Sequence, residues 1–156
     1  MSELQDRIKE IIETEPVAVF MKGTPQFAAC GNSARAVEAL RAVGAPITAV
    51  DVLPDPQIRQ ELSALSGWPT IPQVFVGGEL IGGVDITEEL HATGELERKL
   101  GDKLGDGWQA PGQERVIELA ASGAAAPRAA GAPEGRQPAT LLRAREGSEQ
   151  GGSPSA

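Results

Sequence analysis

Hydrophobic and polar positions follow two different periods along the chain up to about residue 104. Over the first segment, 2–15, apolar residues recur three and four positions apart, which predicts an amphipathic helix. Ser2 followed by Gln5 fits the capping-box spacing at the start of this helix, and Pro16 ends it. A continuous apolar run, Val17–Met21, follows and is typical of a buried strand.

The same succession of helical pattern and short apolar run continues through the middle of the chain. Helical spacing predicts a second helix over 31–43, and the run 47–52 predicts a second strand. Asp55 followed by proline is the pattern of an N-cap and a first helical residue, so a third helix is expected from there to Gly67. A β-hairpin is predicted over 73–81, where two apolar runs flank a pair of glycines.

The last predicted element is a helix. Asp85 and Glu88 repeat the capping-box spacing and open a helix through Leu90. Gly94 interrupts it, and Leu96, Leu100 and Leu104 continue the helical spacing. The predicted order over 2–104 is therefore α-β-α-β-α-β-β-α. A hairpin that follows a β-α-β unit predicts an α/β fold, with a small mixed four-stranded sheet and helices on both faces.

The composition changes at about residue 105. Residues 105–156 are rich in Ala, Gly, Pro and Ser and hold few large apolar side chains. Such a segment buries too little apolar surface to offset the entropy of ordering it. The sequence therefore predicts a folded domain over 1–104 and a disordered tail over 105–156, with a transient helix at 113–121.

Charge and hydropathy narrow the classes of partner. The net charge is −8, which argues against a nucleic-acid or anionic-membrane surface. No run of about 18 apolar residues is present to span a bilayer, and the start of the chain lacks the pattern of a signal peptide. We therefore expect a cytoplasmic protein in a reducing compartment.

The chain contains one cysteine, Cys30, which excludes an internal disulfide and a zinc ribbon. Cys30 directly precedes the second predicted helix, whose free N–H groups and dipole favour a thiolate. Lys22, at the end of the preceding strand, adds positive charge. A buried structural cysteine is the alternative, but the neighbours Asn32 and Ser33 are polar.

Three further patterns are candidates for ligand binding. Pro72 at the start of a strand fits a cis turn, which would leave the backbone of Ile71 free to pair with an extended peptide; an ordinary turn is the alternative. The glycine pair before Asp85 places free N–H groups where a carboxylate could bind. Lys22 and Arg59 could bind a second carboxylate, although each alone is typical of a solvated surface charge.

Taken together, these stretches resemble a known family. The chain contains, in order, "FMKGTP", one Cys in a C-G-x-S motif, "DVLPDPQIRQEL", "GWPTIPQVFVGGELIGGVDI" and "LHATGELERKL". Over about residues 3–104 it resembles a monothiol glutaredoxin of the C-G-F-S class. The resemblance implies a thioredoxin-like fold and glutathione as a bound partner.

The resemblance also implies roles for individual residues. Lys22 and Arg59 would hold the glycine carboxylate of glutathione, and the backbone of Ile71, set by a cis Pro72, would pair with its cysteinyl unit. Val84 and Asp85 would hold the γ-glutamyl end.

Two positions depart from the family pattern. Asn32 stands where the family has Phe, which removes a large apolar ring beside the thiol. Val84 stands where the family often has Cys or Ser, which changes little if the contact is a backbone N–H.

Three functional hypotheses follow from a lone thiol beside a glutathione site. In the first, which the resemblance favours, a homodimer carries a bridging [2Fe–2S] cluster to acceptor proteins, with or without a heterodimeric helper protein. The cluster needs four ligands, which Cys30 from each of two chains and two glutathione thiols would supply. In the second, Cys30 attacks glutathione mixed disulfides as an oxidoreductase, and free glutathione resolves the product. The third is an inactive adaptor that keeps only the fold.

Overall fold

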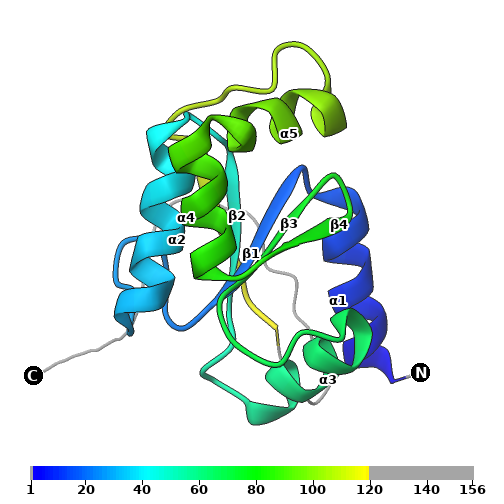
Figure 1. Ribbon diagram of the computed structural model, residues 1–156. Coiled ribbons are helices and arrows are strands. Elements are labelled where there is room, and N and C mark those ends of the chain that lie inside the picture. The colour runs from blue at the N-terminus through cyan, green and yellow to red at the C-terminus, as the bar shows by residue number, and fades with distance from the viewer. Residues whose placement is uncertain (1, 120–156) are drawn as a thin grey trace, which may run out of the picture. The chain divides into compact units, whose positions relative to one another are not determined.

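The computed structural model describes residues 2–119, which form one α/β unit (Figure 1). Its elements alternate along the chain as the hydrophobic pattern predicts. They are α1 (Glu3–Thr14), β1 (Val17–Met21), α2 (Gly31–Ala42), β2 (Ile47–Asp51), α3 (Pro56–Ser66), β3 (Gln73–Val76), β4 (Glu79–Gly82), α4 (Val84–Thr93), α5 (Glu95–Leu104) and β5 (Glu114–Ile117).

The strands form one mixed sheet in the order β4-β3-β1-β2-β5. β1, β2 and β5 are parallel neighbours, whereas β3 is antiparallel to both β1 and β4. Residues of β1 alternate between two apolar cores. Val17 and Val19 pack with α2, α4 and α5 on one face, and Phe20 packs with α1 and α3 on the other. This three-layer arrangement confirms the predicted fold class.

The predicted helix starts are confirmed where a side chain caps the helix. The Ser2 hydroxyl accepts a hydrogen bond from the N–H of Gln5 at 3.0 Å. The Asp55 carboxylate accepts one from the N–H of Gln57 at 2.8 Å, with proline as the first helical residue. Each bond satisfies one of the N–H groups that a helix leaves unpaired at its first turn.

The prediction of four strands is wrong, because the sheet has a fifth. Glu114–Ile117 form β5 where a transient helix was expected, and Glu114 pairs with Ile47 at the start of β2. Leu119 is buried in the core beside α1 and α3. The ordered domain thus extends past residue 104, because the edge of β2 offers backbone partners to this segment. The remainder of the predicted tail, 120–156, lies outside the described residues.

The predicted capping role of Asp85 is also wrong. The N-cap of α4 is Gly83, and no side chain caps the helix; Asp85 lies in its first turn. The Glu88 carboxylate, expected to fold back in a capping box, instead pairs with Arg35 of α2, whose Nε donates to it at 2.9 Å. Asp85 cannot cap because the helix begins at Val84, two residues earlier than a cap at Asp85 requires, with Gly83 in the N-cap position.

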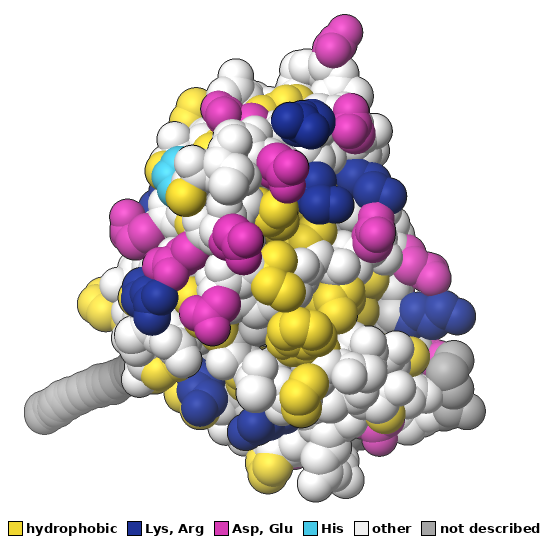
Figure 2. All heavy atoms as spheres, viewed as in Figure 1, with side chains coloured by type: hydrophobic (Ala, Val, Ile, Leu, Met, Phe, Trp, Pro, Cys, Tyr) yellow, Lys and Arg dark blue, Asp and Glu magenta, His cyan; other side chains and the backbone are white. Residues whose placement is uncertain are grey.

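The surface mixes both signs of charge. Figure 2 shows acidic and basic side chains interspersed around hydrophobic side chains in the middle of the visible face. Within residues 2–119, no helix combines the length and the apolarity needed to cross a bilayer.

Candidate functional site

Cys30 occupies the N-cap of α2, at the carboxyl end of β1. Its sulfur accepts a hydrogen bond from the N–H of Ser33 at 3.4 Å, as a capping side chain does. The Ser33 hydroxyl, which is fully buried, lies 3.3 Å from the same sulfur. The backbone N–H of Lys22 donates to that hydroxyl at 3.1 Å. The serine oxygen therefore accepts from the strand end and can donate its own proton to the thiolate.

These contacts set the charge state of the thiol. Burial raises the pKa of Cys30, but hydrogen bonds from the hydroxyl and the N–H of Ser33 lower it, and the Lys22 charge and the Asn32 N–H add to the lowering. The net effect is a pKa below the ordinary thiol value. The sequence prediction that the start of this helix favours a thiolate agrees with this geometry. The thiolate is the form of cysteine that acts as a nucleophile and a metal ligand.

A groove of about 250 Å³ lies beside this position. It is bounded by the loop before β3 and by the start of α4. The Ile71–Pro72 peptide bond is cis, as the sequence predicts. The groove brings together four of the predicted site residues with five others. Its lining residues are Asn32, Trp68, Thr70, Ile71, Pro72, Gly83, Val84, Asp85 and Ile86.

Trp68 lines the groove but is not among the binding residues that the sequence predicts. Its indole nitrogen is buried and has no hydrogen-bond partner among residues 2–119. A side chain on Gly83 would lie 3.2 Å from this nitrogen and 3.2 Å from the carbonyl oxygen of Pro72. Gly83 therefore keeps the floor of the groove open. A tryptophan next to the proline-rich turn is the signal that could have identified it.

Gln73 holds the wall of the groove in place. Its side-chain amide is buried and donates to the carbonyl oxygens of Trp68 at 2.9 Å and Thr70 at 3.2 Å. The Ser66 hydroxyl donates to the other end of the amide at 2.8 Å. A fully bonded buried amide fixes the backbone around it, so the turn is a preformed surface.

The two predicted cations do not line the groove. Arg59 is exposed on α3 and donates to the carbonyl oxygen of Pro69 at 3.3 Å, between the lining residues Trp68 and Thr70. Lys22 is half-buried, and its charge contributes to the low pKa of Cys30. His91, the one histidine, is exposed on α4. Both cations therefore border the site from different elements.

Metal ligation by one chain has no basis in the described residues. Within 2–119, no three His, Cys, Asp or Glu side chains lie close enough to hold a metal ion together. Cys30 is the one thiol that the chain offers.

Comparisons with known proteins agree on one family. The model of the Glutaredoxin family matches residues 17–81. Glutaredoxin 4 of Pasteurella multocida is 50% identical over 100 residues, which cover 64% of this chain and 92% of that protein. Monothiol glutaredoxin-S11 of Oryza sativa is 46% identical over 99 residues, which cover 64% of this chain and 20% of that protein.

Solved structures show the same fold. Reduced apo GrxS14 of poplar is 37% identical, with a TM-score of 0.59 over 65% of this chain and 93% of that one. A buckwheat glutaredoxin in complex with glutathione is 26% identical, with a TM-score of 0.57 over 64% of this chain and 88% of that one.

Proposed function

This chain belongs to the glutaredoxin family, and from that premise we propose that it binds glutathione and carries a [2Fe–2S] cluster as cargo between two copies. The observation that carries the proposal is a single thiol, held toward the thiolate form, beside a preformed groove. Delivery of the cluster to acceptor proteins in the cytoplasm completes the proposal, because a lone thiol stays reduced in that compartment.

The ligand count supports a shared cargo. A [2Fe–2S] cluster takes four ligands, usually thiolates. Within residues 2–119, Cys30 is the one thiol, and no cluster of other metal-binding side chains accompanies it. A second copy would add a second cysteine, and two glutathione thiols would complete the set. The stoichiometry predicts two protein chains and two glutathiones for each cluster.

We propose that the groove takes an extended peptide with a carboxylate at each end. The first N–H groups of α4, at Val84 and Asp85, have no partner within the helix and favour a negative charge. We propose that they hold the γ-glutamyl carboxylate and that the backbone of Ile71 pairs with the cysteinyl unit. The unpartnered indole N–H of Trp68 offers a further donor. Lys22 and Arg59 would hold the glycine carboxylate at the border of the site.

A second function, thiol–disulfide exchange with glutathione, is favoured by the state of the thiol. The Cys30 thiolate would attack the glutathione sulfur of a mixed disulfide and release the other protein as its thiolate. A second glutathione thiolate would then attack the Cys30–glutathione disulfide, which frees Cys30 and leaves glutathione disulfide. Ser33 stands three residues on, fully buried, and its hydroxyl cannot form a disulfide. External glutathione is therefore required.

Anaerobic reconstitution with iron, sulfide and glutathione separates the two functions. We expect visible cluster absorption together with dimerisation, and neither in Cys30→Ala or without glutathione. A cluster that still forms in Cys30→Ala would contradict the carrier function. Rapid turnover of a glutathione mixed disulfide without any cluster would establish the oxidoreductase in its place.

A further inference from the structure

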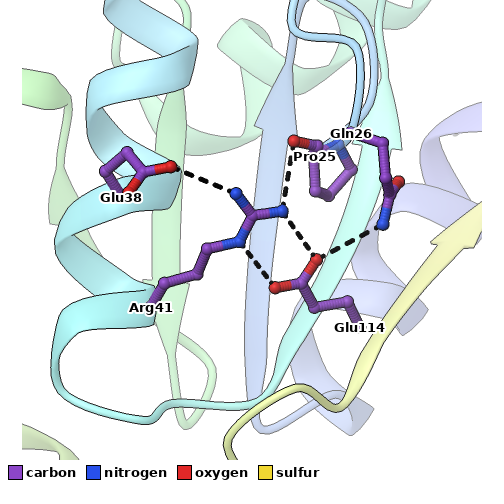
Figure 3. Close-up of polar contacts among 5 residues, drawn as sticks. All are labelled: Pro25, Gln26, Glu38, Arg41 and Glu114. Atoms are coloured by element: carbon purple, nitrogen blue, oxygen red, sulfur yellow. Dashed lines mark hydrogen bonds and ion pairs between the residues drawn. The ribbon is translucent and has the colours of Figure 1, made fainter.

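An ion-pair cluster joins the fifth strand to the loop that precedes Cys30 (Figure 3). Arg41, in the last turn of α2, donates from Nε to one carboxylate oxygen of Glu114 at 2.7 Å and from a terminal nitrogen to the other at 3.0 Å. The Glu114 side chain is only 11% exposed. A two-point contact with a planar guanidinium fixes direction as well as distance.

The same guanidinium holds the tip of the loop. The terminal nitrogen that contacts Glu114 also donates to the carbonyl oxygen of Pro25 at 3.2 Å. The side-chain amide of Gln26 donates to the Glu114 carboxylate at 3.5 Å, and Glu38 accepts from the remaining nitrogen of Arg41 at 3.1 Å. Glu114 thus orients Arg41 and contacts Gln26 directly, and Arg41 in turn anchors Pro25, so the pair holds two successive loop residues.

The loop is a closed unit that ends at the thiol. The N–H of Phe27 donates to the carbonyl oxygen of Thr24 at 3.0 Å, and the N–H of Ala29 donates to that of Lys22 at 2.8 Å. Cys30 follows Ala29 directly. At the other foot of the loop, the N–H of Lys22 donates to the hydroxyl that supports the Cys30 sulfur. Movement of the loop would therefore change the surroundings of the thiol from both ends, through Ala29 and through Lys22.

We propose that Glu114 is a positioning residue for Cys30, acting through Arg41 and the loop 22–30. Glu114 lies in β5, beyond the 3–104 region of family resemblance, so this chain adds a device outside that region. The effect on the loop and the thiol does not depend on what the site binds. The consequence for cluster or glutathione handling rests on the function proposed above.

The chain offers a matched control on the same strand. Arg115 is the next residue of β5 and points to the opposite face of the sheet. It makes a two-point ion pair with Glu15 at 3.0 and 3.1 Å, and neither residue contacts the loop. Arg115→Gln therefore removes a comparable anchor of β5 and leaves the loop contacts in place.

Amide hydrogen exchange of the reduced protein tests the proposal. Glu114→Gln removes the charge and one acceptor, and Arg41→Lys keeps the charge but cannot contact Pro25 and Glu114 in the same geometry. We expect exchange at the N–H groups of Phe27 and Ala29 to rise about tenfold in both variants and to stay within about twofold in Arg115→Gln. Wild-type exchange in both variants, or an equal rise in Arg115→Gln, would overturn the proposal.

The pH profile of Cys30 alkylation by iodoacetamide tests the step from loop to thiol. We expect its midpoint to move in the same direction in Glu114→Gln and Arg41→Lys, and the Arg115→Gln profile to superimpose on that of the wild type. A mobile loop with an unchanged midpoint would overturn the positioning role. Both measurements use the protein without cluster or glutathione, so a failed reconstitution of the wild type leaves their outcome intact.

Discussion

Two hollows lie at opposite ends of the sheet, and the smaller one, not the larger, is the candidate binding site. The larger, about 370 Å³, lies where β1, β2 and β5 begin and is bordered by Glu15, Thr48, Trp108 and Arg115. The smaller, about 250 Å³, is the groove beside Cys30 at the end of β1. The thiol lies beside the smaller one.

The difference lies in the polar groups. In the larger hollow, Glu15 pairs with Arg115 at 3.0 Å and accepts from the Thr48 hydroxyl at 2.8 Å, so its charges are already satisfied. In the groove, the buried indole N–H of Trp68 lacks a partner among residues 2–119, and the nearby thiol has a lowered pKa. A ligand gains affinity by pairing with polar groups that lack a partner, whereas a large volume by itself does not provide affinity.

Filling the groove is expected to have the largest effect. Gly83→Val places a side chain against Trp68 and the carbonyl oxygen of Pro72, each 3.2 Å from the first added carbon. We expect glutathione affinity, measured by calorimetry, to fall at least about tenfold, or about 1.4 kcal/mol.

Ala110 lines the larger hollow, so Ala110→Val is the matched control. It should leave the affinity for glutathione unchanged. Equal losses in the two variants would show that the two ends of the sheet do not differ in function.

Removing the hydroxyl beside the thiol should raise the pKa of Cys30 and destabilise the fold. Ser33→Ala deletes the oxygen that accepts from the Lys22 N–H and supports the sulfur. The unsatisfied N–H should cost about 1–3 kcal/mol of unfolding free energy. Alkylation of Cys30 near neutral pH should slow because less thiolate is present.

Ser63→Ala is the control, since the Ser63 hydroxyl is buried with no partner among residues 2–119. Its loss should leave stability equal or higher and alkylation unchanged. Equal losses of unfolding free energy and of alkylation rate in the two variants would show that Ser33 does not stabilise the thiolate.

Restoring the family residue beside the thiol should lengthen the lifetime of a bound cluster. Asn32 is exposed, lines the groove and accepts from Arg35 at 3.3 Å. Asn32→Phe covers the site with apolar surface, which limits solvent access. Cluster absorption should decay more slowly than in the wild type. Asn32→Ala, which loses the same Arg35 contact without adding a ring, should not slow it; an unchanged or faster decay in Asn32→Phe would reject this explanation.

Breaking the ion pair of the larger hollow should have a small effect. The Arg115 side chain is 53% exposed, so Glu15→Gln should cost under about 1 kcal/mol in chemical denaturation. The alkylation profile of Cys30 should not change. A shifted profile would mean that the two ends of the sheet are coupled.

The smallest expected effect is a pH dependence of stability that comes from the thiol. The pKa of Cys30 is lower in the folded protein than its ordinary value, so between these two values the unfolded chain binds a proton that the folded chain does not. The unfolding free energy relative to Cys30→Ser should therefore rise with pH across that window, level off above it, and be lost as pH falls through the lowered pKa. A flat difference would contradict a lowered pKa.

Most of the fold was predictable because its signals are local. The helix caps at Ser2 and Asp55, the hairpin at the paired glycines and the turn at Pro72 each depend on a few neighbouring residues. β5 was not predictable in this way, since its four residues, two charged and then two apolar, show no strand period and become a strand only by pairing with β2.

The features of the site likewise divide into those that follow from local motifs and those that depend on residues far apart in the sequence. Cys30 at a helix start and the groove at Ile71 and Pro72 follow from sequence motifs. The contact of Arg41 with Glu114 joins residues 73 positions apart, and no local pattern marks it. Asp85 failed as a cap because α4 begins two residues earlier than expected, after Gly83. β5 and the Arg41–Glu114 contact both depend on pairing between residues far apart in the sequence, which local patterns do not mark.

Each of the two hollows compared above contains one of the two tryptophans of this chain. Trp68 lines the groove and Trp108 lines the larger hollow, and the sequence contains two tryptophans and no tyrosine. The protein therefore carries its own optical reporters. Quenching of Trp68 would record occupancy of the groove, and a Trp68→Phe variant would leave emission that responds to the opposite end of the sheet alone.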